Sequence, residues 1–285
     1  MTTVLAERTA ELRRDRSHGG SWMARRAVEA LAEVANEPAT SSEELLERLV
    51  NAGRELAASR RAMGAIAGAM SRVLAAAKHE AHLPPDELRR LVHEEVQGLV
   101  GSRDRAAVAI AVLLRPLLNE AVVLTHSASA TVREAVQYTV PELVICTVSA
   151  PLEEGRTFAD ELRGGGLNVE LVEDDDAERA LDRASLLLLG ADTVYRDGSV
   201  CNKVGTRRLA EAASRRAVRT VVACEVLKLA PIDPPETIDD ENFDITPAHL
   251  IDEVFTEEGA FTRENARSLI DRTPFLAEGY SLLRS

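Results

Sequence analysis

The segment from Leu186 to Ala210 brings a carboxylate, an amide and an amine close together in the sequence. Four leucines at 186–189 indicate a buried strand of a parallel sheet, and Asp192 follows just past its carboxyl end, where open α/β sheets bind ligands. Asn202 and Lys203 stand directly before a run of helical composition, and a lysine beside a helix amino terminus attracts anions. The segment therefore predicts an anion-binding site. A strand, a tight turn and a helix start would also use these residue types for geometry alone.

A second polar group, His126, Ser127 and Ser129, follows the strand predicted at 121–124. Because the carboxyl ends of parallel strands meet at one edge of a sheet, these side chains are expected to share a pocket with Asp192. The two serine hydroxyls precede a predicted helix and could bind a phosphate. A single histidine is more often a packed or surface residue, so the joint placement carries this prediction.

The chain divides into a helical half and an alternating half. Residues 1–118 read as six helices, the last two starting at Pro84 and at Arg103, with a capping-box pattern at Ser41 and Glu44. From residue 119 short β-rich runs alternate with helical segments, which predicts βαβ units and a parallel sheet. The strands are expected at 121–124, 143–147, 168–172, 185–189 and 219–223, and the helices near 131–138, 156–163, 176–183 and 206–216. The predicted class is α/β: an all-helical domain, 1–118, and a Rossmann-like doubly wound parallel-sheet domain, 119–285.

The composition restricts the partners and the compartment. The 47 acidic against 34 basic residues give a net charge of −13, which argues against direct binding to nucleic acid. No apolar run is long enough to span a membrane, and the amino terminus has no signal-like apolar region, so the protein is expected in the cytoplasm. The three cysteines have no metal-ligand spacing, so neither a metal site nor a cofactor is predicted.

The basic residues are almost all arginine, since lysine occurs only at positions 78, 203 and 228. An acidic, lysine-poor and alanine-rich chain is similar to proteins from salt-loving cytoplasms, where screening weakens charge repulsion. High genomic G+C content produces the same arginine and alanine bias, so both explanations stay open.

The pattern Gly190-Ala191-Asp192, Asn202-Lys203 and Gly205-Thr206 resembles the signature of the translation initiation factor 2B alpha/beta/delta family. That family also contains methylthioribose-1-phosphate isomerase and ribose-1,5-bisphosphate isomerase. The resemblance covers roughly residues 16–262, with further matches at 243–247 and 255–259, and it is closest to archaeal members. It implies a helical domain followed by a Rossmann-like domain with a phosphosugar-type pocket.

The resemblance names Asp192 and Ser127 as catalytic candidates. In the isomerases a cysteine, in the pattern Thr-His-Cys-Asn, and the aspartate move protons between the carbons of a phosphorylated sugar. Ser127 stands at the cysteine position here, and a hydroxyl is a far poorer acid than a thiol of pKa about 8.5. The isomerases also carry Glu-Thr-Arg-Pro where this chain has Val148-Ser149-Ala150-Pro151, so a phosphate-clamping arginine is replaced by Ala150.

Other positions are implied to bind the ligand. A loop between the first two helices touches the phosphate in the isomerases; Gly19 and Gly20 stand there, without the matching arginine. Arg156 is kept, and Glu225 and Lys228 match an Ala-Glu-Thr-Tyr-Lys element. The predicted ligand-binding residues are Gly19, Gly20, His126, Ser127, Ser129, Arg156, Asn202, Lys203, Glu225 and Lys228.

Two functions follow from these matches. One is a regulatory, initiation factor 2B-like protein that binds a sugar phosphate or nucleotide phosphate and has translation initiation factor 2 as a partner. The alternative is a phosphosugar aldose–ketose isomerase, an intramolecular oxidoreductase, with Asp192 as base. Ser127 and Ala150 favour the first; Asp192, Asn202 and Lys203 favour the second. A structural paralogue with an inactive pocket stays open as a third possibility.

Relatives in this family pair through the second domain, which implies a homodimer or a larger homo-oligomer. Leu250, Ile251, Val254 and Phe255 recur at helical spacing near Phe261 and predict an apolar dimer contact. The same residues could instead close the core of the monomer.

Overall fold

The computed structural model describes residues 3–284, which form two compact units. The helical unit contains the residues up to Arg103, Leu227–Pro231 and the chain from Ile270 onward; the sheet unit contains Asp104–Val226 and Ile232–Leu269. Helix α5 (Pro85–Leu118) belongs to both, because the units divide between Arg103 and Asp104, fifteen residues before the boundary expected after residue 118. The prediction of two separate helices in this stretch is wrong, because no proline stands between Pro85 and Pro116 to end the helix.

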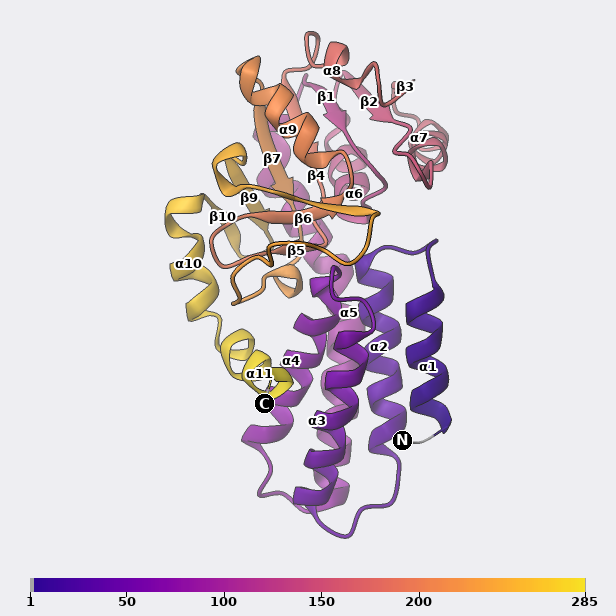
Figure 1. Ribbon diagram of the computed structural model, residues 1–285, viewed down its shortest axis with the longest axis vertical. Helices are drawn as coiled ribbons and strands as arrows, with labels where there is room; N and C mark the ends of the chain where they lie inside the picture. The colour runs from indigo at the N-terminus through magenta and orange to yellow at the C-terminus, as the bar shows by residue number, and fades with distance from the viewer. Residues whose placement is uncertain (1–2, 285) are drawn as a thin grey trace. The chain divides into compact units, whose positions relative to one another are not determined.

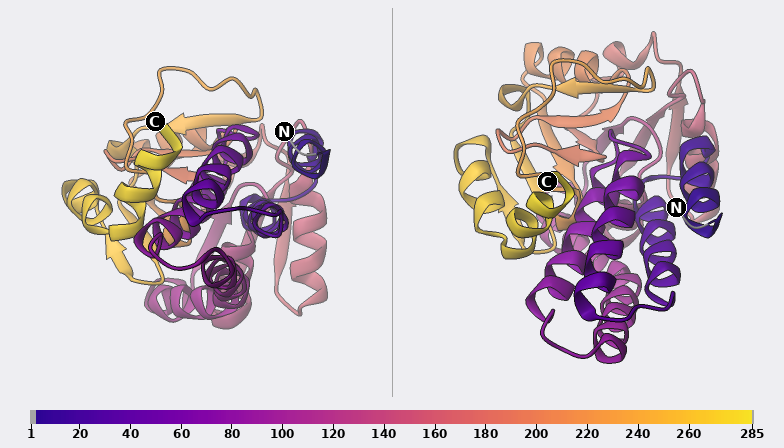
Figure 2. Two further views of the ribbon diagram at one scale, coloured as in Figure 1. Left: turned by 90° about the horizontal axis from the view of Figure 1, so that it is seen from below. Right: turned by 60° about the horizontal axis from the view of Figure 1, so that its bottom comes forward.

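Small residues let the helices of the helical unit approach closely. Figure 2 shows the amino-terminal helices of this unit in indigo and purple and its carboxy-terminal helix in yellow. A Cβ added at Gly279 would lie 2.2 Å from the backbone oxygen of Ser71, so α11 packs directly on α4. Ser41 caps α3 by accepting a hydrogen bond from the Glu44 amide at 3.1 Å, as the sequence predicts. The other helices of this unit are α1 (Thr3–Arg14), α2 (Gly20–Ala35), α3 (Ser42–Ala58), α4 (Gly64–His79) and α11 (Pro274–Arg284).

The sheet unit is built on a seven-stranded sheet with the order β10-β9-β7-β4-β1-β2-β3 (Figure 1). Only β10 runs antiparallel to its neighbour. The strands are β1 (Val122–Thr125), β2 (Leu143–Thr147), β3 (Val169–Val172), β4 (Leu186–Leu189), β7 (Arg219–Ala223), β9 (Glu253–Thr256) and β10 (Gly259–Phe261). The chain crosses from one half of the sheet to the other between β3 and β4, which is the doubly wound arrangement. The predicted fold class is therefore confirmed.

A second, three-stranded antiparallel sheet lies in the same unit and was not predicted from the sequence. It contains β5 (Thr193–Val194), β6 (Val200–Lys203) and β8 (Phe243–Thr246), in the order β5-β6-β8. The helical segments of the unit are α6 (Ala130–Thr139), α7 (Glu154–Gly164), α8 (Ala177–Ala180), α9 (Thr206–Arg215), α10 (Arg263–Arg272, which runs on into the helical unit) and the 3₁₀ helix η2 (Ala248–Leu250). A further 3₁₀ helix, η1 (Val226–Lys228), begins at the last residue of this segment of the sheet unit and continues into the helical unit.

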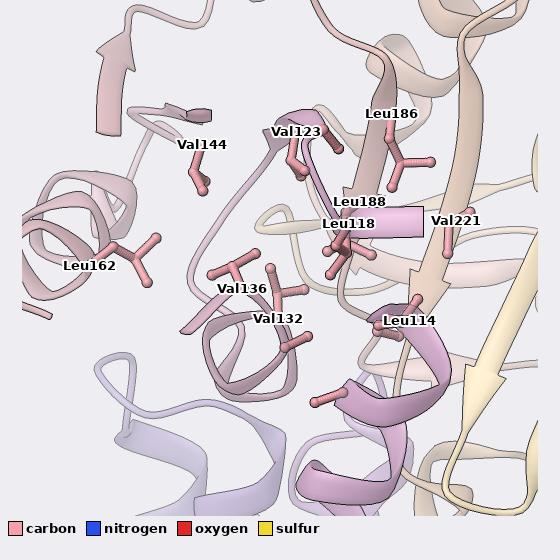
Figure 3. Packing of buried hydrophobic residues seen from close by; sticks show 14 of the residues in the cluster. Leu114, Leu118, Val123, Val132, Val136, Val144, Leu162, Leu186, Leu188 and Val221 are labelled. Carbon is pink, nitrogen blue, oxygen red and sulfur yellow. The ribbon is translucent and has the colours of Figure 1, made fainter. Parts of the chain in front are cut away.

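Aliphatic side chains fill the core of the sheet unit. Val123 and Leu188, from β1 and β4, lie with Leu118 of α5 in one buried cluster (Figure 3). Val132 and Val136 of α6 belong to the same cluster. Truncating such a side chain to alanine typically lowers the free energy of unfolding by about 2–5 kcal/mol. Packing in this core therefore holds the strands in place, and with them the strand ends.

The structure contradicts the helical, exposed apolar face that was predicted as a dimer contact at 250–255. The segment forms η2 and β9 rather than a helix with an apolar face. Ile251, Val254 and Phe255 are 6%, 2% and 7% exposed, and Phe255 is part of the aliphatic core. These residues close the core of the sheet unit. None of the helices between residues 3 and 284 combines the length and hydropathy that a membrane crossing requires.

Candidate functional site

His126 follows β1 and is held at both ring nitrogens. Its Nδ1 lies 2.7 Å from the Thr147 hydroxyl and its Nε2 lies 2.8 Å from the Val204 carbonyl oxygen. Since a carbonyl oxygen only accepts, Nε2 carries the proton and Nδ1 accepts from Thr147. The ring is 3% exposed, and this burial lowers the pKa of His126 below its ordinary value. His126 is therefore neutral at pH 7 and joins β1, β2 and the start of α9.

A directed chain of hydrogen bonds continues from His126. The Ser149 hydroxyl lies 2.8 Å from that of Thr147, and it accepts the Ser127 backbone N–H at 2.7 Å. Because Thr147 donates to His126, Ser149 donates to Thr147. Ser127 and Ser149 have φ angles of 68° and 67°, in the left-handed region that non-glycine residues rarely adopt. Such conformations cost about 1–3 kcal/mol each and concentrate at functional sites.

Glu154, at the start of α7, connects the two polar groups that the sequence singles out. Its Oε1 accepts the Ser127 hydroxyl at 2.6 Å, and its Oε2 lies 3.1 Å from the Lys203 ammonium. The Lys203 side chain is 5% exposed and that of Glu154 is 26% exposed. A Cβ added at Gly155 would lie 1.8 Å from the Thr147 carbonyl oxygen, so glycine there lets α7 begin against β2. The structure thus joins Ser127 and Lys203 through one carboxylate.

Asp192 directly precedes β5, and Asn202 lies on the neighbouring strand β6 of the small sheet. The Asp192 amide donates to the Cys201 carbonyl at 2.9 Å, which places Asp192 beside the carboxyl end of β6. Asn202 is 6% exposed and donates through Nδ2 to the Thr206 hydroxyl at 3.0 Å. That hydroxyl donates to the Lys203 carbonyl at 2.6 Å, so Asn202 also fixes the start of α9.

Asp244 of β8 supports the same helix start. One carboxylate oxygen accepts from the amides of Gly205 at 2.8 Å and Arg207 at 3.2 Å, which are otherwise unpaired donors at the first turn of α9. Burial raises the pKa of Asp244 from 3.8 to about 6, although both hydrogen bonds favour the charged form. This residue belongs to the matched segment 243–247 but was not among the predicted site residues.

Ser129 and Arg156 have partners of their own. The Ser129 hydroxyl caps α6 by accepting from the Val132 amide at 3.3 Å, and a Cβ added at Gly190 would lie 2.6 Å from it. The loops after β1 and β4 therefore touch. The half-exposed Arg156 forms ion pairs with Glu153 at 3.0 Å and with Glu173 at 3.1 Å.

Glu225 is a buried carboxylate that follows β7, with 8% of its surface exposed. Glu257, near it, accepts the Val226 amide at 2.9 Å; burial raises the pKa of Glu257, and the charges of Glu225 and Glu258 add to the rise. The remaining candidates belong to the helical unit. Lys228 is buried in η1, and Gly19 precedes α2 without a side-chain cap, next to Gly20.

The sheet unit therefore gathers most predicted residues at the carboxyl edge of its strands, namely His126, Ser127, Ser129, Asp192, Asn202 and Lys203. It adds Glu154, which the sequence reading missed. The available signal was its position: it directly precedes the matched Gly155-Arg156 pair, in the loop that follows a predicted strand. A buried ammonium, a buried amide and two carboxylates can together bind a hydroxylated anionic ligand.

Comparisons with known proteins agree with this fold. The model of the Initiation factor 2 subunit family matches residues 16–237. A translation initiation factor eIF-2B subunit 2-like protein of Pyrococcus horikoshii is 30% identical over 227 residues, 78% of each chain. A ribose 1,5-bisphosphate isomerase of Haloterrigena turkmenica is 31% identical over 186 residues, 52% of this chain and 57% of the other. The solved tetrameric eIF2B-beta2-delta2 complex from C. thermophilum has a TM-score of 0.83 at 22% identity, over 94% of this chain and 93% of that chain, which shows the fold alone.

Proposed function

Because the chain belongs to the Initiation factor 2 subunit family, we propose that it is a regulatory, initiation factor 2B-like protein that binds a phosphorylated sugar or nucleotide. The binding site is the carboxyl edge that carries Asp192, Asn202 and Lys203. Arg156 and Glu225 of the same unit complete the proposed ligand contacts there, and Gly19, Gly20 and Lys228 of the helical unit stay predicted ligand-binding residues.

The observation that carries this proposal is Ser127. It stands where the resemblance to the isomerases calls for a catalytic thiol, and its hydroxyl proton is already donated to Glu154 at 2.6 Å. The nearest imidazole, His126, has both nitrogens occupied and a lowered pKa, so it is a poor proton donor. A site with these properties supports binding without turnover.

The proposed partners follow from the relatives. The solved eIF2B-beta2-delta2 complex is tetrameric, which supports assembly of this chain into an oligomer. We propose a homodimer or a larger homo-oligomer, with translation initiation factor 2 as a further partner. The arginine-rich composition and net charge of −13 support work in a salt-rich archaeal cytoplasm.

The test is to incubate the purified protein with phosphorylated pentoses and nucleoside monophosphates and to follow binding and products by NMR. We expect ligand resonances to broaden or shift with no new product, and Lys203→Gln to abolish the shift. Turnover of a phosphopentose would contradict the regulatory proposal.

One observation favours the isomerase as a second candidate. Glu154 gives the Ser127 hydroxyl a proton acceptor, and Asp192 lies at the same edge, so a base and a proton-transfer group are both present. If this activity exists, ribose 1,5-bisphosphate should be converted to the ketose, and Asp192→Asn should abolish the conversion. Ser127→Cys should then raise the rate, since a thiol is the better acid.

A further inference from the structure

Glu154 binds the two hydrogen-bond donors that an anionic ligand would need. Its two carboxylate oxygens take up the Ser127 hydroxyl at 2.6 Å and the Lys203 ammonium at 3.1 Å. A phosphate bound at this edge would seek the same two donors, because an ammonium and a hydroxyl near a helix start are ordinary phosphate ligands.

The exposures of the two side chains show which one a ligand meets first. Lys203 keeps 5% of its side chain exposed, whereas Glu154 keeps 26%. The Glu154 side chain is thus the more accessible member of the pair. An anion that approaches Lys203 is repelled by Glu154 unless this carboxylate moves aside.

Resting on the proposed binding function, we propose that Glu154 is an internal anion that blocks the phosphate position on Lys203 and Ser127 and must be displaced by the ligand. The site then selects ligands by their negative charge. A phosphate monoester carries close to two negative charges at pH 7 and competes with one carboxylate, whereas a neutral sugar or a monocarboxylate does not.

Loop geometry lets the displacement stay local. Glu153, the residue before Glu154, has a φ of 53°, and Ser149 at the start of the same loop also has a positive φ. The loop is held at Ser149 and Ala150, whose amides donate to the Asp174 carboxylate at 2.8 and 2.7 Å. Rotation of the Glu154 side chain therefore requires no movement of the β2 end.

The experiment compares the wild type, Glu154→Gln and Glu161→Gln in titrations with inorganic phosphate, followed by calorimetry at constant ionic strength. Glutamine keeps an acceptor for the Ser127 hydroxyl but removes the charge. We expect phosphate to bind at least tenfold more tightly to Glu154→Gln than to the wild type. Glu161→Gln removes the same charge from another residue of α7, which pairs with Arg133 instead, and should change affinity less than twofold.

The outcomes separate this inference from the proposed function. If ribose 5-phosphate or adenosine monophosphate binds the wild type and Glu154→Gln binds phosphate equally or more weakly, Glu154 is a ligand contact and the inference is overturned alone. If neither the wild type nor Glu154→Gln binds phosphate, ribose 5-phosphate or adenosine monophosphate, both fail. Should Glu154→Gln not fold, Glu154→Asp decides, because its shorter carboxylate cannot span both donors: tighter phosphate binding than the wild type supports the inference, and equal or weaker binding overturns it.

Discussion

His126 shows how one buried side chain fixes an edge of the sheet unit. Sequence reasoning placed it at the carboxyl end of the first strand but could not assign its partners, since Thr147 and Val204 lie 21 and 78 residues away. The same limit explains Glu154, whose contacts with Ser127 and Lys203 span 27 and 49 residues. Candidates near strand ends could be predicted because strand ends are visible in the sequence; their pairing depends on the packed sheet.

Replacing His126 with phenylalanine should destabilise the protein by about 2–4 kcal/mol, because the buried Thr147 hydroxyl and Val204 carbonyl lose their partner. Since burial holds the pKa of His126 below 6.5, the unfolded chain binds the proton more tightly and wild-type stability falls as pH drops below 6.5. The variant should lack this part of the pH dependence in thermal melts. His82→Phe is the control, with 73% of the side chain exposed. Equal effects of the two substitutions would contradict the assigned role.

Asp244 predicts a pH dependence of the opposite sign. Its folded pKa of about 6 exceeds the ordinary 3.8, so the folded protein binds the proton more tightly, and its contribution to stability is lost as pH rises from about 4 to 6. The loss is at most about 3 kcal/mol. Asp244→Asn should flatten the stability profile in this range and raise the melting temperature at pH 7. Parallel profiles for both proteins would refute the prediction.

At the scale of elements, the strands of the large sheet were predictable and those of the small sheet were not. Strand β4 consists of four leucines, a pattern that predicts a buried strand. Strand β5 has two residues, and β6 pairs with β8, about forty residues further on, so neither leaves a local pattern. The small sheet nevertheless holds Asn202 and Lys203, which explains why their surroundings could not be read from the sequence.

Helix α7 offers a test of how closely an element must approach the sheet. Gly155→Ala would place a methyl group against the Thr147 carbonyl, a backbone atom that cannot yield, and should cost at least about 2 kcal/mol. Gly164→Ala, at the other end of the same helix, meets nothing within 4 Å and should be neutral or slightly stabilising. Chemical denaturation of both variants provides the measurement. A destabilisation of similar size at both positions would show that close approach is not the cause.

At the scale of the whole molecule, charge governs the expected behaviour in salt. The net charge of −13 creates repulsion that extends over about 10 Å at 0.1 M ionic strength and is screened at higher salt. The ion pairs at the surface, such as Arg183–Glu170 at 2.6 Å and Arg208–Glu178 at 2.9 Å, are partly solvated and individually contribute little to stability.

The melting temperature should therefore rise between about 0.1 and 2 M potassium chloride, because the screened repulsion outweighs the weakened pairs. Calorimetry over this range tests it, and light scattering on the same samples tests whether a dimer accompanies the rise. A melting temperature that falls with salt would show that the surface pairs dominate. A monomer at every salt concentration would refute the proposed oligomer.

The hydrogen-bond chain from Ser127 to Val204 has a consequence for proton conduction. It begins at a backbone N–H, which can only donate, and ends at a carbonyl oxygen, which can only accept. The hydroxyls of Ser149 and Thr147 and the imidazole between these ends therefore have a single permitted orientation. A proton wire must reverse all its members after each passage, and this chain cannot reverse. It therefore stabilises the edge of the sheet and conducts no protons to it.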